Sequence, residues 1–111
     1  MSNLNDLAIP LSALDFTSDE TASATADNWM VIQVGVLLQA VVEHHARSVL
    51  DEGDIHSVSV TFDVSADAAT GTQVEFESRI DRKTRTLIFV SGVAKQNDRH
   101  LLKATVVFRI S

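Results

Sequence analysis

The longest apolar stretch of the chain lies between Met30 and Val42 and contains no charged residue. We interpret residues 34–50 as one long helix, and a helix that is apolar nearly all round is a buried helix. Glu43 lies inside it, although a Glu is rarely buried unless it is paired or takes part in chemistry. A carboxylate part-way along a buried helix is therefore the first candidate for a functional residue.

The segments that follow the helix have the apolar patterns of β-strands. Three of them alternate apolar and polar residues, and Leu87–Ala94 is apolar on both faces, as expected for a central strand. A short strand at 21–26 precedes the helix, and turn residues at 81–84 and 97–99 join antiparallel neighbours. We therefore predict an α+β fold in which an antiparallel sheet of about five strands wraps around one long central helix. The strands predicted after the helix cover residues 57–64, 74–80, 87–94 and 102–110.

Length and composition narrow the class of protein. The 111 residues suffice for one domain, which we place at 1–111 with an N-terminal extension at 1–19, whose residues 8–11 are expected to pack loosely on the domain. A net charge of −6 argues against a nucleic acid partner, and without Cys there is no disulfide, thiolate metal site or Cys nucleophile. The N-terminus lacks a secretory signal pattern, and the apolar run at 30–42 is too short to span a membrane. We expect a cytoplasmic protein without a membrane partner.

Over about residues 20–111, the order of elements resembles that of the hotdog-fold acyl-CoA thioesterases, in particular the phenylacetate-degradation and 4-hydroxybenzoyl-CoA types. Three positions match most closely, namely Asn28, Gly35 and Glu43. The family has an Asn or Gln before the helix, a Gly at its start and an acidic residue about two turns further. The segment 82–87 looks like the basic hairpin turn of the family. The resemblance implies an acyl-CoA thioesterase with CoA as part of the substrate and no separate cofactor.

Two segments differ from the family pattern. Where the family has His-Gly-Gly, this chain has Val34-Gly35-Val36, with Gln33 one place earlier. The strand after the helix ends at 62–66 without the basic residue and Pro that are common in the family. These differences keep two alternatives open, a non-catalytic hotdog protein that binds an acyl or aromatic ligand, and a dimeric structural or interaction module. A hotdog dehydratase is disfavoured because no His–Asp pair stands near the helix start.

Thioester hydrolysis needs a polarised carbonyl oxygen and a delivered nucleophile. A backbone N–H at a helix N-terminus polarises an oxygen, and Gly35 suits this role because no side chain blocks the substrate. Close packing of the helix on a strand explains the same Gly equally well. Glu43 can attack the thioester carbon or take a proton from water. An ion pair with Arg47 at the (i, i+4) spacing is the structural explanation, and the two roles are compatible.

Several other residues are weaker candidates for substrate binding. Asn28 can contact the substrate or a water, or it can serve as a turn or helix cap. Gln33 can stand in for the missing His or be a satisfied polar side chain. Ser57 and Ser59 open the strand after the helix, where related enzymes often place a hydroxyl, although exposed serines are common on β-strands. The resemblance also implies an apolar slot for the acyl tail beside the helix residues Met30, Val34 and Leu38.

Basic residues cluster around the turn at 81–84. Arg82, Lys83 and Arg85, with Arg79 nearby, can hold the phosphates of CoA. The same residues are explained by a solvated, charged turn that protects a sheet edge from pairing. Both interpretations stay open at this point.

The histidines do not predict a metal site. His44 and His45 are adjacent on the helix, so their side chains point about 100° apart and cannot both bind one ion. One of them can line an interface and titrate near neutral pH. His56 and His100 are expected to be solvated at strand edges.

These observations predict a single hotdog domain that hydrolyses an acyl-CoA and forms a homodimer or homotetramer. A strand at 87–94 that is apolar on both faces needs cover on its outer side, which a second copy can provide. In related proteins the site lies between two subunits, with the helix carboxylate facing the start of the partner's helix. The resemblance implies the same arrangement here.

Overall fold

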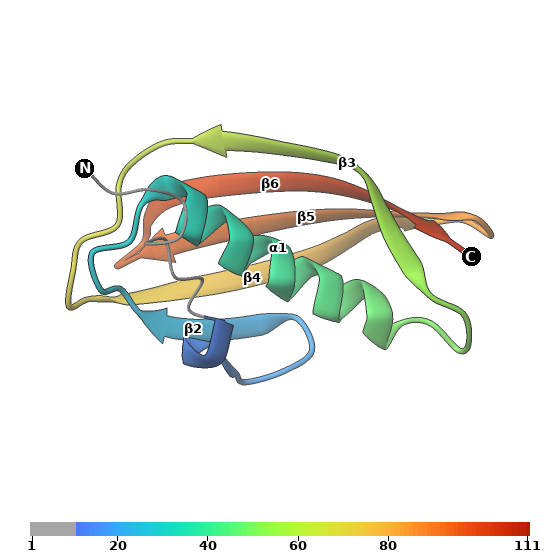
Figure 1. Ribbon diagram of the computed structural model, residues 1–111, viewed down its shortest axis with the longest axis horizontal. Helices are drawn as coiled ribbons and strands as arrows, with labels where there is room; N and C mark the ends of the chain where they lie inside the picture. The colour runs from blue at the N-terminus through green and yellow to red at the C-terminus, as the bar shows by residue number, and fades with distance from the viewer. Residues whose placement is uncertain (1–10) are drawn as a thin grey trace, which may run out of the picture.

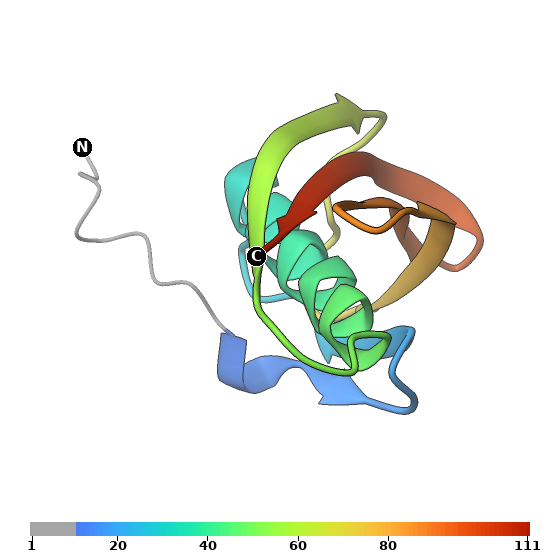
Figure 2. The same ribbon diagram turned by 90° about the vertical axis from the view of Figure 1, so that its right-hand side faces the viewer.

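One long helix lies in the hollow of a curled antiparallel sheet in the computed structural model, which describes residues 11–111 (Figure 1). Figure 2, seen from one end, shows the sheet curving around the helix. The six strands follow the spatial order β1-β2-β4-β5-β6-β3, and every neighbouring pair is antiparallel. The elements are a short 3₁₀ helix (Leu11–Ala13), β1 (Asp15–Phe16), β2 (Thr21–Thr25), α1 (Val31–Ser48), β3 (Ile55–Val64), β4 (Gln73–Lys83), β5 (Leu87–Gln96) and β6 (Arg99–Ile110).

The predicted order of strand, helix and four strands is confirmed, with β5 in the interior of the sheet. The sheet also contains β1, whose two residues are too few to show an apolar period. The turn between β5 and β6 lies where expected, and its residues Asn97 and Asp98 have φ values of 48° and 66°. Two positive φ values in a two-residue turn fit the twist of a hairpin. The turn between β4 and β5 comes later than predicted, because β4 continues through a bulge to Lys83.

Both ends of the helix differ from the prediction. α1 begins at Val31, three residues earlier than expected, and the N–H of Met30 donates to Oε1 of Gln33 over 2.7 Å. This contact fixes the first turn without any of the usual capping residues. The helix ends at Ser48, two residues before the predicted end, and Gly53, with φ of 90°, lies in the following loop.

The core lies between one face of α1 and the strands β4, β5 and β6. The helix packs tightly against β5 at Gly92, where an added Cβ would lie 2.6 Å from Cγ1 of Val42 and 2.9 Å from Cδ1 of Leu38. Burying one such large side chain stabilises the fold by about 1.5–3 kcal/mol. The largest fully buried side chains are Leu37, Leu38, Val41, Val42, Val74, Phe76, Ile88, Val90, Leu101, Val106 and Phe108.

The strand β3 is an edge strand that leaves one side of α1 open. Within residues 11–111 it pairs with β6 alone, and its apolar residues Val58 and Val64 are 53% and 56% exposed. On α1, Ile32 is 52% exposed. The sheet therefore covers one face of the helix, and the face toward β3 is open. The apolar pattern of the sequence did not distinguish these two faces.

Two expectations concern the ends and surroundings of the domain. The loose packing predicted for residues 8–10 lies outside the described residues, and Leu11 next to them is 49% exposed. Within residues 11–111, no helix combines the length and the apolar character needed to cross a membrane.

Candidate functional site

An apolar groove with a volume of about 550 Å³ opens between the first half of α1 and the end of β3. Gly35 lies in it, and a Cβ added there would lie 3.4 Å from Cζ of Phe62 and 3.7 Å from Cδ2 of Leu102. The missing side chain therefore leaves space directly beside the Phe62 ring. The groove is lined by Val31, Ile32, Gly35, Val36, Phe62, Val64 and Leu102.

The groove lies on a different face of α1 from the acyl slot that was predicted beside Met30, Val34 and Leu38. Val34 and Leu38 are 3% and 0% exposed and belong to the core, because the sheet covers their face of α1. Met30 is exposed at 53%. The open groove follows the neighbouring stripe of the helix instead, at Ile32, Gly35 and Val36.

The backbone donors that point out of the start of α1 belong to Val31 and Ile32. The N–H groups of Gln33 and Val34 donate to the carbonyl oxygen of Met30 over 3.0 and 3.2 Å. In the part of the chain that the structure describes, no group accepts a hydrogen bond from the N–H of Val31 or Ile32. Both residues line the groove, whose exposed surface is almost entirely apolar, so the two donors lie beside the groove, at the positive end of the helix dipole.

Gly35 is the fifth residue of α1, and this position changes its predicted role. In an α-helix, the N–H of the fifth residue donates a hydrogen bond to the carbonyl oxygen of the first residue. Because α1 begins earlier than expected, the Gly35 N–H is directed along the helix and not toward a substrate. Its contribution to the site is the space beside Phe62.

Gln33 is buried and secures the start of the helix through its bond with the Met30 N–H. This geometry agrees with the interpretation of Gln33 as a satisfied polar side chain. Asn28 lies in the loop before α1 with φ of 52°. Its N–H donates to Oγ1 of Thr70 over 3.0 Å, and its Oδ1 accepts from the same hydroxyl over 3.1 Å. Asn28 therefore joins two loops, in agreement with a turn role.

Glu43 lies on the same stripe of α1 as the groove, two turns beyond Val36. Its side chain is 39% exposed, so the prediction of a buried carboxylate is wrong for the single chain. The residue escapes burial because β3 does not cover this stripe. Oε1 of Glu43 accepts a hydrogen bond from Arg47 over 2.9 Å, as the (i, i+4) spacing predicted.

Arg47 also donates a hydrogen bond to Asp54, which precedes β3. The hydrogen bonds to Asp54 and then to Glu43 raise the pKa of the Arg47 guanidinium. The bond from Arg47, followed by that from the Ile55 N–H, lowers the pKa of Asp54. The helix carboxylate thus belongs to a charged network that connects the end of α1 with the start of β3.

The N–H groups at the start of α1 and the Glu43 carboxylate are far apart within one chain. Glu43 follows Ile32 by eleven helical residues, which corresponds to about 17 Å along the axis. One thioester carbonyl therefore cannot contact both the free N–H groups and Glu43 of the same chain.

The remaining predicted residues lie away from the groove. Ser57 and Ser59 are exposed near the start of β3, on either side of a bulge, whereas Phe62 and Val64 line the groove near the end of this strand. The basic turn, with exposed Arg82, Lys83 and Arg85, lies at the end of the molecule where α1 ends (Figure 1). Arg79 is paired with Asp81 over 2.9 Å.

The adjacent histidines of α1 have different partners. Nε2 of His44 lies 3.1 Å from Oδ1 of Asp19, and Nδ1 of buried His45 lies 2.8 Å from Oγ of Ser78. Residues 11–111 contain no group of three or more His, Cys, Asp or Glu that could hold a metal ion.

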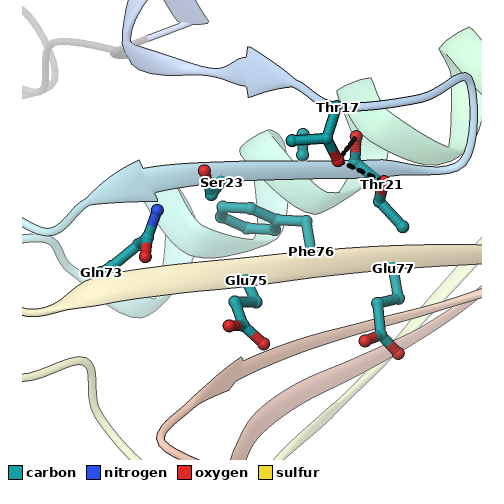
Figure 3. Close-up of a pocket in the computed structure, with 8 residues that line it drawn as sticks. Thr17, Thr21, Ser23, Gln73, Glu75, Phe76 and Glu77 are labelled. Atoms are coloured by element: carbon teal, nitrogen blue, oxygen red, sulfur yellow. Dashed lines mark hydrogen bonds between the residues drawn. The ribbon is translucent and has the colours of Figure 1, made fainter.

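A second hollow lies on the outer side of the sheet between β2 and β4, and Glu75 and Glu77 are among the residues that line it (Figure 3). Figure 3 shows Glu75 and Glu77 extending from β4 away from Phe76, and Glu77 pairs with Lys95 over 2.9 Å. The two carboxylates would repel the phosphates of a nucleotide. This hollow therefore does not suit an acyl-CoA.

Solved structures with the same architecture are numerous, although neither a protein-family model nor a curated protein sequence matches this chain. The Streptococcus mutans UA159 protein smu.793, bound to acetyl CoA, has a TM-score of 0.82 at 12% identity over 99% of this chain and 97% of that chain. This chain has the hotdog fold. The predicted resemblance to hotdog thioesterases is thereby confirmed in the fold.

Two further hotdog structures cover nearly the same residues. A phenylacetic acid degradation-related protein from Ralstonia eutropha JMP134 has a TM-score of 0.76 at 14% identity, over 95% of this chain and 93% of that chain. A hypothetical thioesterase protein from Streptococcus pneumoniae TIGR4, solved with coenzyme A, has a TM-score of 0.76 at 10% identity, over 88% and 86%.

Sequence reasoning missed the groove residues Ile32, Phe62 and Leu102 and the donors of the first helical turn. Phe62 lies within the strand predicted at 57–64, but the alternating pattern does not reveal that β3 diverges from α1. The helix start was missed because Met30 is not a residue that usually caps a helix.

Proposed function

We propose that this protein hydrolyses an acyl-CoA or a related acyl thioester in a site formed by two copies of the chain. The observation that carries this proposal is the apolar groove that opens beside the first turn of α1, where the N–H groups of Val31 and Ile32 have no acceptor among residues 11–111. The hotdog fold supports it, because structures with this fold have been solved with coenzyme A and with acetyl CoA.

A homodimer joined along β3 supplies the missing half of the site. Among the described residues, no strand pairs with the outer edge of β3, and Val58 and Val64 on this strand are apolar and exposed. Two copies paired antiparallel along this edge place the start of one β3 opposite the end of the other. Glu43 lies toward the β3 start and the groove toward its end, so Glu43 of the partner subunit approaches the groove.

In this arrangement each group has one role in the reaction. The N–H groups of Val31 and Ile32 stabilise the charge that develops on the carbonyl oxygen. Glu43 of the partner subunit accepts a proton from water, and the hydroxide adds to the carbonyl carbon. The tetrahedral intermediate collapses, the carbon–sulfur bond breaks, and the proton held by Glu43 passes to the CoA sulfur. Direct attack by the carboxylate, followed by hydrolysis of the anhydride, gives the same products.

In the same dimer, the basic turn can bind the phosphates of CoA. Arg82, Lys83 and Arg85 lie at the end of the molecule opposite the groove. In the antiparallel dimer, the partner's turn moves toward the groove end of the first copy. We propose that Arg82, Lys83 and Arg85 hold the phosphates of CoA, by charge-assisted hydrogen bonds.

Release of free CoA thiol from a panel of acyl-CoAs tests the activity directly. The chain contains no Cys, so a thiol reagent reports only released CoA. We expect turnover with at least one apolar acyl group. Absence of turnover with every substrate would reject the hydrolase proposal.

Mixing two inactive variants tests whether the site is shared. Val31→Pro removes one donor without a helix penalty, because Pro is favoured at the first helical position and Met30 has the extended backbone that precedes Pro. Glu43→Gln removes the carboxylate. Random mixing makes half of the dimers mixed, each with one intact site, so activity should return to about a quarter of the wild-type value. Mixed samples no more active than either variant alone would reject a shared site.

One observation favours the alternative of a non-catalytic acyl-binding protein. Glu43 is held by Arg47, and this ion pair already explains its place on the helix. The binding alternative predicts saturable binding of acyl-CoA, without release of thiol, that is unchanged in Glu43→Gln.

A further inference from the structure

We infer that the acyl group is a hydrocarbon without polar substituents, and that the gap between Gly35 and Phe62 limits how much of it the groove accepts. This inference rests on the proposed thioester substrate and names its acyl class. It separates plain aliphatic or phenyl acyl groups from hydroxylated and charged ones.

The first support is the lining of the groove. Its six side chains are all apolar, Gly35 adds none, and its exposed surface contains almost no polar atoms. The nearest free donors, the N–H groups of Val31 and Ile32, are assigned to the thioester carbonyl. A hydroxyl further along the acyl chain would lose its water without gaining a partner. An apolar pocket rejects an added hydroxyl by about a factor of 100 at most.

The second support is the size of the groove. Its volume of about 550 Å³ falls within the range of small-molecule sites. Each methylene that enters such a space improves binding about fourfold, until no space remains. The groove therefore favours acyl groups longer than acetyl.

The third support is the pair formed by Gly35 and Phe62. A methyl group at position 35 would lie 3.4 and 3.5 Å from two atoms of the Phe62 ring, which is close contact without overlap. Gly in a helix interior costs about 1 kcal/mol relative to Ala. Gly35→Ala therefore folds, and it fills space that the acyl group would otherwise occupy.

The experiment measures binding and turnover with the same CoA thioesters. The panel pairs acetyl, hexanoyl and octanoyl groups with phenylacetyl and 4-hydroxyphenylacetyl groups. Calorimetry gives the Kd, and thiol release gives kcat/KM. We expect the Kd to fall about fourfold per methylene beyond acetyl until the groove is full. We also expect phenylacetyl-CoA to be preferred over its hydroxylated analogue by about 10–100-fold.

Two variants and a matched control test whether Gly35 and Phe62 determine the preference among acyl groups. Gly35→Ala should weaken octanoyl-CoA relative to acetyl-CoA by about tenfold, and Phe62→Ala should shift the preference toward larger acyl groups. Phe16→Ala is the control, because Phe16 is 39% exposed like Phe62 but lies on β1, at the opposite edge of the sheet. The control should leave the order of preference unchanged.

Binding and turnover distinguish the two possible failures. Equal Kd values for hydroxylated and plain acyl groups, or equal shifts in Phe16→Ala and Phe62→Ala, would overturn the inference even if thiol is released. The expected order of Kd values without any thiol release would support the inference and reject the hydrolase. Turnover without a preference for apolar groups would support the hydrolase and reject the inference.

Discussion

Arg47 donates a hydrogen bond to Glu43 over 2.9 Å and so ties the candidate catalytic carboxylate to its own helix. The same guanidinium contacts Asp54 before β3. These two contacts hold the guanidinium in place and limit the positions that the Glu43 side chain can take. Arg47 is therefore a positioning residue for Glu43 in the proposed mechanism.

Replacement of Glu43 by Gln is expected to lower kcat by about 10²–10⁴, the scale of a lost acid–base group. Acyl-CoA binding should persist, because the groove and the N–H groups of Val31 and Ile32 remain. Arg47→Met should lower kcat less than Glu43→Gln does and leave KM nearly unchanged, because it releases the Glu43 side chain without removing the carboxylate. Glu52→Gln, which removes an exposed carboxylate from the loop after α1, is the matched control. A Glu43→Gln enzyme as active as wild type would exclude Glu43 from the mechanism.

Removal of charge from the basic turn should affect only substrates that contain CoA. In Arg82→Ala/Lys83→Ala we expect a higher KM for acyl-CoA and little change for a short thioester without the nucleotide. Each exposed phosphate contact contributes about 1 kcal/mol or less, so the combined effect is about tenfold. Arg99→Ala/Lys103→Ala removes the same charge elsewhere and should leave both KM values unchanged. Equal changes for both substrates would mean that the turn is only a solvated surface.

The fold was predictable because its signals are local and repeated. An uncharged run from Met30 to Val42 gives the helix, and alternation at positions such as Val106 and Phe108 gives the strands. The two-residue β1 has no such signal. The early helix start was also hidden, because a contact with the Gln33 side chain replaces a recognisable cap at Met30.

The site was less predictable because it depends on which face of the helix the sheet covers. Val34 and Ile32 are equally apolar in sequence, yet Val34 is 3% exposed and Ile32 is 52% exposed. The difference follows from the path of β3, which diverges from α1 and opens the groove. The periodicity of apolar residues in the sequence does not indicate that β3 diverges from α1. Gly35 was identified from its spacing to Asn28 and Glu43 in the sequence. In the structure it leaves room beside the Phe62 ring and does not supply a hydrogen-bond donor.

Stability at low pH should depend on Asp81. The hydrogen bond from Ser91, followed by that from Arg79, lowers the pKa of this carboxyl in the folded protein. A lowered pKa contributes stability that is complete above the unfolded value of about 4 and is lost as pH falls through the folded value. Asp81→Asn should therefore flatten the fall of Tm with pH below about pH 4. An unchanged slope would mean that Asp81 does not contribute to acid sensitivity.

A charge on the free edge of the sheet should separate the proposed dimer. Val60 on β3 is 38% exposed, and a Lys at an open sheet edge opposes pairing with a second strand. Light scattering of Val60→Lys should give the 12.1 kDa monomer, with loss of thioester turnover. Val49→Lys is the control, because Val49 is 37% exposed but lies after α1. Wild type that is monomeric at micromolar concentration would overturn the dimer itself.

The contact between α1 and β5 should tolerate no added atom at Gly92. A methyl group there would lie 2.6 Å from Cγ1 of Val42 and 2.9 Å from Cδ1 of Leu38, closer than packed carbon atoms can approach. Both neighbours are fully buried and cannot move toward solvent. Gly92→Ala should therefore destabilise the fold by about 1–3 kcal/mol, the usual cost of overpacking.

Val42→Ala alone should also destabilise it, because it leaves a cavity. In the double variant the new methyl group occupies space that Val42 vacates, so the loss should be smaller than the sum of the two single losses. Urea unfolding of the four proteins measures this coupling, and additive losses would show that Gly92 and Val42 do not compete for the same space.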